Sequence, residues 1–364
     1  MTLLLEALQA TDGDCLLLHH GSKATPHLIL VDGGRSKSVD TTLMPRLEEL
    51  RRAAAGGAGE PELAIELTVL SHIDADHVAG LVKLTQKMID RQDAKEPTGW
   101  WLGEIWMNGF DQVLGNQETQ RLLLPGAGPA PGGVAATVKQ TCELRNNLDR
   151  LGVAVNHSMG GELVGRPDDH VVPVPWEDLE LSVLAPTRAE LQALETVWDK
   201  ELQALRAGKP AGGDSEIINA ASIVLLVEQD GRSLLLTGDA RTEDIVRGLT
   251  AASRLRDGGP PCTVDVLKLP HHGADGNCTE ELFERVHARH YVICAGPDDK
   301  NQNPDPRTLE RLWAARGGDS KQWTLHVTFA DGQVRHFDDW RRSHPAAQVV
   351  YRDAKAPGTM IELA

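Results

Sequence analysis

The sequence predicts an α/β fold in which two sheets pack face to face and helices cover their outer faces. Both halves of the chain run through short apolar segments of strand length and then through segments with helical spacing of apolar residues. A sheet or helix with one apolar face must bury that face against another element, which favours such layers. The 364 residues, 41% hydrophobic and 25% charged, are typical of a folded chain with one large core.

In the N-terminal part, apolar runs next to turn residues predict strands over 16–18, 27–31 and 65–70. A helix is expected over 42–55, because Leu43, Leu47 and Leu50 recur at helical spacing. A second amphipathic helix is expected after His77, so the third strand leads into a helix through a short loop.

The C-terminal half repeats this order of strands and helices. Strands over 223–228 and 233–237 are expected to form a hairpin around a turn that contains Gly231. Further along, a strand, a helix, a strand, a helix and a last hairpin are expected over 264–269, 280–287, 291–294, 308–315 and 323–337.

The domain organisation is predicted from where this regular pattern breaks down. We expect a single domain over 1–345, with an irregular and partly helical insertion at about 90–215. The last residues, 346–364, are expected to form a C-terminal extension.

The charge balance disfavours a protein that clamps bulk nucleic acid. The chain has 37 Lys and Arg against 53 Asp and Glu, a net charge of −16, and a negative field repels polyanions. A small-molecule or nucleotide-type substrate remains compatible with this charge. No apolar run approaches the roughly 20 residues of a membrane span, and the N-terminus lacks a secretory pattern, so we expect no membrane association and a cytoplasmic location.

The strongest chemical signal is a cluster of metal-ligand residue types at the end of the strand 65–70. His72, Asp74, Asp76 and His77 fall within six residues, where the strand gives way to a helix. His72 and Asp74 can project to one side of an extended loop, while Asp76 and His77 diverge as the helix begins. One loop can therefore serve two neighbouring cations.

Two later strands also end on metal-ligand residue types. Leu234 to Leu236 lead to Asp239, a carboxylate that would be costly to bury without a partner. The strand 264–269 leads to the paired histidines His271 and His272. Either feature alone is ordinary at a strand end. Together with the cluster after the strand 65–70, the two features indicate a metal centre.

These motifs resemble the metallo-β-lactamase superfamily, and within it the hydrolase domain of ComEC-type competence proteins and their stand-alone relatives. The resemblance covers most of residues 1–315, with 90–215 only loosely matched. It rests on the segments Val31 to Gly34, His72 to His77, Asn219 to Leu225, Leu235 to Asp239 and Asp265 to Gly273. It implies a four-layer αββα sandwich with a dinuclear site at one edge of the two sheets.

The resemblance also implies the ligands of two divalent metal ions, zinc or manganese. His72 and Asp74 would hold one ion, Asp76 and His77 the other, with Asp239 bridging and His271 completing the second site. His272 is open between a ligand, a residue that supports a ligand and a proton donor, and Asp76, Asp239 and His272 are the expected catalytic residues. His157 and His170 are candidates for one further ligand, although surface histidines are commoner at such positions.

Hydrolysis is the expected reaction, because paired cations lower the pKa of a water between them and polarise the scissile bond. The resemblance favours a phosphodiester, in a nuclease or a nucleotide phosphodiesterase. Asp74 stands where many superfamily members have histidine, which makes the site less cationic and favours oxygen-seeking metals such as manganese. Ala274 lacks a hydroxyl group that relatives carry, and Asp275 and Asp305 would repel a phosphate if they faced the site.

Two alternatives stay open at this point. Hydrolysis of an ester, thioester or lactone would use the same centre. A non-catalytic or partner-dependent module of a larger assembly would instead use the insertion at 90–215 to bind another protein.

Overall fold

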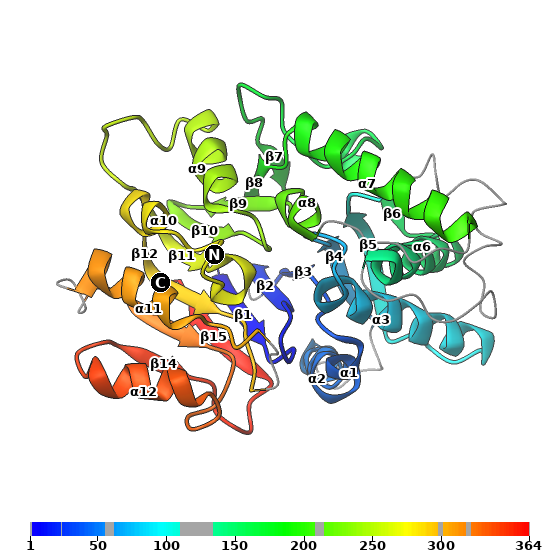
Figure 1. Ribbon diagram of the computed structural model, residues 1–364. Coiled ribbons are helices and arrows are strands. Elements are labelled where there is room, and N and C mark those ends of the chain that lie inside the picture. The colour runs from blue at the N-terminus through cyan, green and yellow to red at the C-terminus, as the bar shows by residue number, and fades with distance from the viewer. Residues whose placement is uncertain are drawn as a thin grey trace.

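Two mixed β-sheets lie at the centre of the computed structural model, which describes residues 2–22, 24–54, 62–109, 134–207, 215–297, 301–317 and 322–363 (Figure 1). The first sheet has seven strands, in the order β15 (Gly358–Glu362), β1 (Thr2–Leu8), β2 (Leu16–Gly21), β3 (Pro26–Val31), β4 (Leu63–Val69), β5 (Trp100–Trp106) and β6 (Ala154–Val155). The second has eight, in the order β14 (Val349–Tyr351), β13 (Thr324–Val327), β12 (Val286–Ile293), β11 (Cys262–Lys268), β10 (Arg232–Leu236), β9 (Val224–Gln229), β8 (Leu179–Ala185) and β7 (Val174–Trp176).

Helices flank the sheets on both sides (Figure 1). Those that follow strands of the first sheet are α1 (Ser36–Ser38), the π-helical turn Val39–Leu43, α2 (Met44–Ala54), α3 (Ala75–Asp93) and α6 (Val134–Leu151). Those in the second half are α7 (Arg188–Arg206), α8 (Ser215–Ala220), α9 (Thr242–Ala251), α10 (Glu280–Arg285), α11 (Pro306–Arg316) and α12 (Arg335–Ser343). Short 3₁₀ turns cover His157–Met159 and Pro270–Gly273. No helix in the described ranges combines the length and the apolar character needed to cross a bilayer.

The buried apolar side chains form three clusters, which separate the layers. One lies between the sheets and joins Ile29 and Leu67 of the first sheet to Leu225 and Leu236 of the second. A second cluster packs the other face of the first sheet against α2, α3 and α6 through Leu30, Leu47, Leu81 and Leu144. The third packs the second sheet against α9 to α12 through Leu267, Ile245, Phe283, Leu312 and Phe337. The fold is therefore α/β, and its layers are compatible with the expected sandwich.

The expected hairpin at 323–337 is wrong in its second half. β13 pairs in parallel with both β12 and β14, and the chain after it forms α12 instead of a returning strand. Val334, Phe337 and Trp340 are three residues apart and all are buried in the same cluster. This helical spacing is the signal that the strand interpretation overlooked.

The segment expected as an insertion and the segment expected as a C-terminal extension both supply strands to the sheets. The stretch 90–215 contributes β5 and β6 to the first sheet and β7 and β8 to the second, while 110–133 and 208–214 within it lie outside the described residues. The last residues, expected as an extension, contribute β14 to the second sheet and β15 to the first, where β15 pairs antiparallel with β1.

A close backbone contact fixes the loop after β3 to the start of α3. Gly33 donates its N–H to the carbonyl of His77 at 2.9 Å, and Gly80 donates to the carbonyl of Gly34 at 2.8 Å. A Cβ atom at Gly80 would lie 1.8 Å from the carbonyl oxygen of Gly33, so only glycine permits this approach.

We expect Gly80→Ala to lower the free energy of unfolding by about 1–3 kcal/mol, because the added methyl must push the two segments apart. Alanine normally stabilises a helix relative to glycine, so the contact has to outweigh that gain. Gly276→Ala is the matched control, since a Cβ there meets nothing within 4 Å. Urea unfolding of both variants measures the difference, and equal stabilities would show that the contact is not tight.

Candidate metal centre

The residues expected to bind metal follow strands of both sheets, and their side chains meet in one cluster. The loop after β4 carries His72 and Asp74, and the first turn of α3 carries Asp76 and His77. In the second sheet, β10 and β11 run parallel, so the loops that follow them carry Asp239 and the histidine pair 271–272 to the same edge. Segments far apart in sequence therefore supply one cluster.

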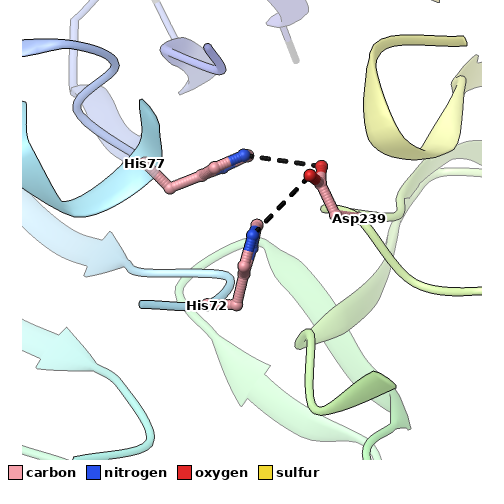
Figure 2. A group of neighbouring side chains, drawn as sticks. All are labelled: His72, His77 and Asp239. Atoms are coloured by element: carbon pink, nitrogen blue, oxygen red, sulfur yellow. Dashed lines mark ion pairs between the residues drawn. The ribbon is translucent and has the colours of Figure 1, made fainter. Parts of the chain in front are cut away.

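Asp239 is at the middle of this cluster and is buried. Its Oδ1 lies 3.4 Å from His77 Nε2, and its Oδ2 lies 3.7 Å from His72 Nε2. Figure 2 shows both imidazoles pointing at the carboxylate from the side of the first sheet. From the second sheet, His271 Nε2 and His272 Nε2 lie 3.6 and 3.7 Å from Oδ2.

The structure groups His272, rather than His271, with the expected second-site ligands. His272 Nε2 lies 3.4 Å from Asp76 Oδ2, and one ligand atom each from Asp76, His77 and His272 falls within 4.8 Å of the others. His271 contacts Asp239 but stays 27% exposed, and its Nδ1 lies 2.9 Å from Asn277 Oδ1. Asp74 approaches His72, with Oδ2 and Nε2 3.9 Å apart.

The paired histidines both occupy left-handed backbone, and they reach different neighbours. Their φ angles are 48° for His271 and 57° for His272, a conformation that non-glycine residues seldom adopt. His272 points inward, with Nδ1 2.9 Å from the carbonyl of Cys294, while His271 faces the rim.

His157 and His170 lie away from the cluster in the described part of the chain. His157 begins an exposed 3₁₀ turn, and no group of close ligand atoms found among the described residues includes it. His170 is exposed and pairs with its neighbour Asp169 at 2.6 Å. Among the described residues, neither belongs to a close group of ligand atoms.

Asp32 orients His77 and was not among the expected site residues. It is buried after β3, and its Oδ2 lies 2.8 Å from His77 Nδ1. Its two oxygens also accept hydrogen bonds from the backbone N–H and hydroxyl of Ser71, each at 2.7 Å. A carboxylate on one imidazole nitrogen directs the other nitrogen at a metal, so Asp32 turns Nε2 toward Asp239. The sequence feature that could have identified Asp32 is its position at the end of a strand, directly before two glycines.

Asp14 and Lys268 form a buried ion pair behind the cluster, which sequence reasoning also missed. Lys268 Nζ pairs with Asp14 Oδ2, donates to the carbonyl of Gly238 at 2.9 Å and lies 3.8 Å from Asp239 Oδ1. Asp14 Oδ1 lies 3.3 Å from His272 Nδ1. A charged residue inside the apolar run of β11 was the sequence signal for Lys268.

The cluster fits divalent cations by the chemistry of its buried atoms. Several ligand atoms are buried without a hydrogen-bond partner in the described structure: His72 Nε2, His77 Nε2, His272 Nε2, Asp14 Oδ1 and Asp239 Oδ1. Leaving such atoms unsatisfied costs about 1–3 kcal/mol each. Imidazole nitrogen and carboxylate oxygen are metal ligands, and a cation among them would satisfy several at once.

Burial and neighbouring charges shift the pKa values within the cluster. They hold some side chains in the deprotonated form that binds metal and keep others protonated. Burial, aided by repulsion from His77, lowers the pKa of His72 to about 3. Burial, aided by the charges of Asp76 and Asp239, raises the pKa of Asp74 to about 7. Burial opposes charge on His272, yet Asp239 and Asp14 raise the pKa of His272 to about 10. Cations that bind here would therefore displace protons.

We expect Lys268→Met to lower the free energy of unfolding by about 3–5 kcal/mol, because it leaves buried Asp14 without its partner. Adding Asp14→Asn should recover part of this loss, since the two changes together remove both charges of the pair. Arg254→Met is the control, because it breaks the exposed ion pair with Glu228 and should cost at most about 1 kcal/mol. Urea unfolding at fixed metal concentration gives the comparison; equal losses for Lys268→Met and Arg254→Met would contradict the assignment.

Fold and site together define an α/β protein of two mixed sheets with a buried His/Asp cluster able to hold metal ions. Residues of this chain are 30% identical over 142 positions to ComE operon protein 3 of Bacillus subtilis (strain 168). Microtubule-associated protein 1A of Mus musculus is 28% identical over 149 positions, and that of Rattus norvegicus is 28% identical as well. No family model matches the chain.

These similarities are partial on both sides. Each covers 37% of this chain, but only 17% of ComE operon protein 3 and 5% of either microtubule-associated protein. The chain thus matches a small part of the length of each relative. The match to ComE operon protein 3 agrees in part with the resemblance drawn from the motifs.

Proposed function

We propose that this protein is a metal-dependent hydrolase of the metallo-β-lactamase type, with a dinuclear centre. The observation that carries the proposal is the buried carboxylate of Asp239, which four imidazole nitrogens from two separate segments approach within 3.4 to 3.7 Å. The unpartnered Nε2 atoms of three of these histidines support it. The 30% identity to part of ComE operon protein 3 is consistent with it.

The geometry favours a revised set of ligands for the two ions, zinc or manganese. His72 and Asp74 would hold one ion, and Asp76, His77 and His272 the other, with Asp239 between them. Two such ions lower the pKa of a water and polarise the bond to be cleaved. Asp32 would keep His77 oriented, and Asp14 would do the same for His272.

His271 then becomes free for contact with the substrate. It lies at the rim, 27% exposed, and Asn277 fixes its ring through Nδ1. Asn277 in turn donates to the carbonyl of Asp239 at 2.9 Å, which ties the ring to the centre. The role of proton donor to a leaving group, expected for His272, therefore suits His271 better.

A phosphodiester is the proposed substrate, in a nuclease or nucleotide phosphodiesterase reaction. The carboxylates that would repel a phosphate are compensated: Asp275 pairs with Arg311 at 2.8 Å and Arg307 at 3.1 Å, and Asp305 pairs with Arg307 at 3.3 Å. Hydrolysis of an ester, thioester or lactone is the second candidate. A non-catalytic module that binds a protein partner is the third.

We expect Asp239→Asn to keep the fold but to lose bound metal and activity, because a neutral amide cannot bridge two cations. Metal affinity should fall more than about tenfold, measured by elemental analysis after dialysis against defined metal. Asp230→Asn is the control, since it changes an exposed turn carboxylate to a residue that tolerates left-handed backbone. Full metal content with wild-type turnover in Asp239→Asn would disprove the bridging role.

Substrate class is tested by comparing bis(p-nitrophenyl) phosphate with a thioester and a lactone, for the manganese and zinc forms separately. We expect the phosphodiester to be cleaved fastest, and nucleotide-sized substrates better than long duplex DNA, with any DNA cleavage falling steeply as salt rises. A thioester or lactone cleaved about a hundredfold faster with each metal, a gap of roughly 2.7 kcal/mol in barrier, would establish the second candidate instead. No hydrolysis by the metal-loaded protein would favour the third.

A further inference from the structure

We propose that Arg35 binds the negatively charged phosphate of the substrate and so selects phosphodiesters over uncharged esters. This inference rests on the proposed function, because it concerns the substrate of the same centre. It assigns a specificity-determining role to a residue outside the candidate ligands.

The backbone places Arg35 beside the centre and holds it there. Arg35 follows Gly34 and is the N-cap residue of α1. The hydrogen bonds from Gly33 to His77 and from Gly80 to Gly34 join this loop to the first turns of α3. Since α3 also carries Asp76, the separation between Arg35 and Asp76 is fixed by a rigid backbone contact.

The guanidinium group is held in a defined orientation. Nε and Nη2 of Arg35 donate to the two carboxylate oxygens of Asp12, each at 2.8 Å. Nη2 also lies 3.8 Å from Asp76 Oδ2. In the structure as described, no hydrogen bond engages Nη1, and the side chain is 40% exposed. Asp12 therefore fixes the planar group and leaves Nη1 without a hydrogen bond among the described residues.

Arg35 is more exposed than Lys268, the other cationic side chain close to the centre. Among the described residues, Lys268 and Arg35 are the Lys or Arg side chains within 4.0 Å of a candidate ligand carboxylate. Lys268 is completely buried, so a substrate cannot reach its ammonium group. Arg307 and Arg311 pair with Asp275 and, among the described residues, form no ion pair with a candidate ligand carboxylate. Arg35 is thus the cation best placed to meet an anionic substrate.

The chemistry of the guanidinium group matches a phosphodiester. A phosphodiester carries one negative charge shared by two non-bridging oxygens, and a planar guanidinium group can donate to both. A thioester, lactone or simple ester has no such charge. Cations bound to Asp74 and Asp76 would neutralise these carboxylates, which otherwise attract Arg35, and leave Asp12 to hold it.

The test compares Arg35→Met with wild type in the full chain loaded with manganese. We expect the KM for bis(p-nitrophenyl) phosphate to rise about 10- to 100-fold, as for a lost hydrogen bond to a charged group, with a smaller change in kcat. Calorimetric titration with dimethyl phosphate should show the same loss of affinity without any turnover. Metal content should be unchanged, which separates this effect from damage to the centre.

Two further variants keep the result interpretable. Arg35→Lys retains the charge but not the planar group, so its affinity for dimethyl phosphate should lie between those of wild type and Arg35→Met. The same variant replaces Arg35→Met in the comparison if Arg35→Met fails to fold. Arg289→Met is the matched control, because Arg289 on β12 is 71% exposed and pairs with Asp265 on β11, and the variant should bind dimethyl phosphate like wild type.

The outcomes separate this inference from the proposed function. Equal affinity of wild type and Arg35→Met for dimethyl phosphate, or no binding by wild type, would overturn the role of Arg35. Binding that depends on Arg35 without hydrolysis of any phosphodiester would support Arg35 and refute the proposed activity.

Discussion

The burial of the Asp239 carboxylate between the two sheets is the constraint on which the candidate centre depends. A carboxylate removed from water needs compensating charge or hydrogen bonds, and here they come from both sheets. His72 and His77 reach it from the first sheet, and the histidine pair and Lys268 reach it from the second. The same group therefore joins the two halves of the fold electrostatically, while the apolar cluster between the sheets joins them by packing.

A second set of contacts holds this cluster in place. Asp32 fixes the imidazole of His77, and the ion pair of Asp14 with Lys268 stands behind Asp239 and His272. The turn before β2 takes part directly, because a Cβ atom at Gly13 would lie 2.0 Å from the carbonyl oxygen of Asp76. The positions of the candidate ligands therefore depend on segments that contribute no expected ligand themselves.

The sequence predicted the α/β class and most central strands, because their apolar runs are local signals. It did not predict the role of 346–364, since the pairing of β15 with β1 joins the two ends of the chain and leaves no local pattern. Metal-ligand residue types at the ends of β4, β10 and β11 were sufficient to select the cluster. Which of His271 and His272 lies next to Asp76 was not predictable, because it depends on the course of the backbone within one turn. Asp14 was missed for a related reason: an aspartate in a Gly-containing turn looks the same whether it faces solvent or Lys268.

The left-handed backbone at His271 and His272 implies a conflict between stability and chemistry at this turn. Each non-glycine residue in that region costs roughly 1–2 kcal/mol relative to ordinary backbone, and glycine would relieve the strain. Glycine at either place would also remove an imidazole that faces Asp239. Selection for stability alone would therefore favour Gly-Gly here, whereas the chain keeps two histidines ahead of Gly273. A search for stabilised variants that ignored function would be expected to lose these side chains first.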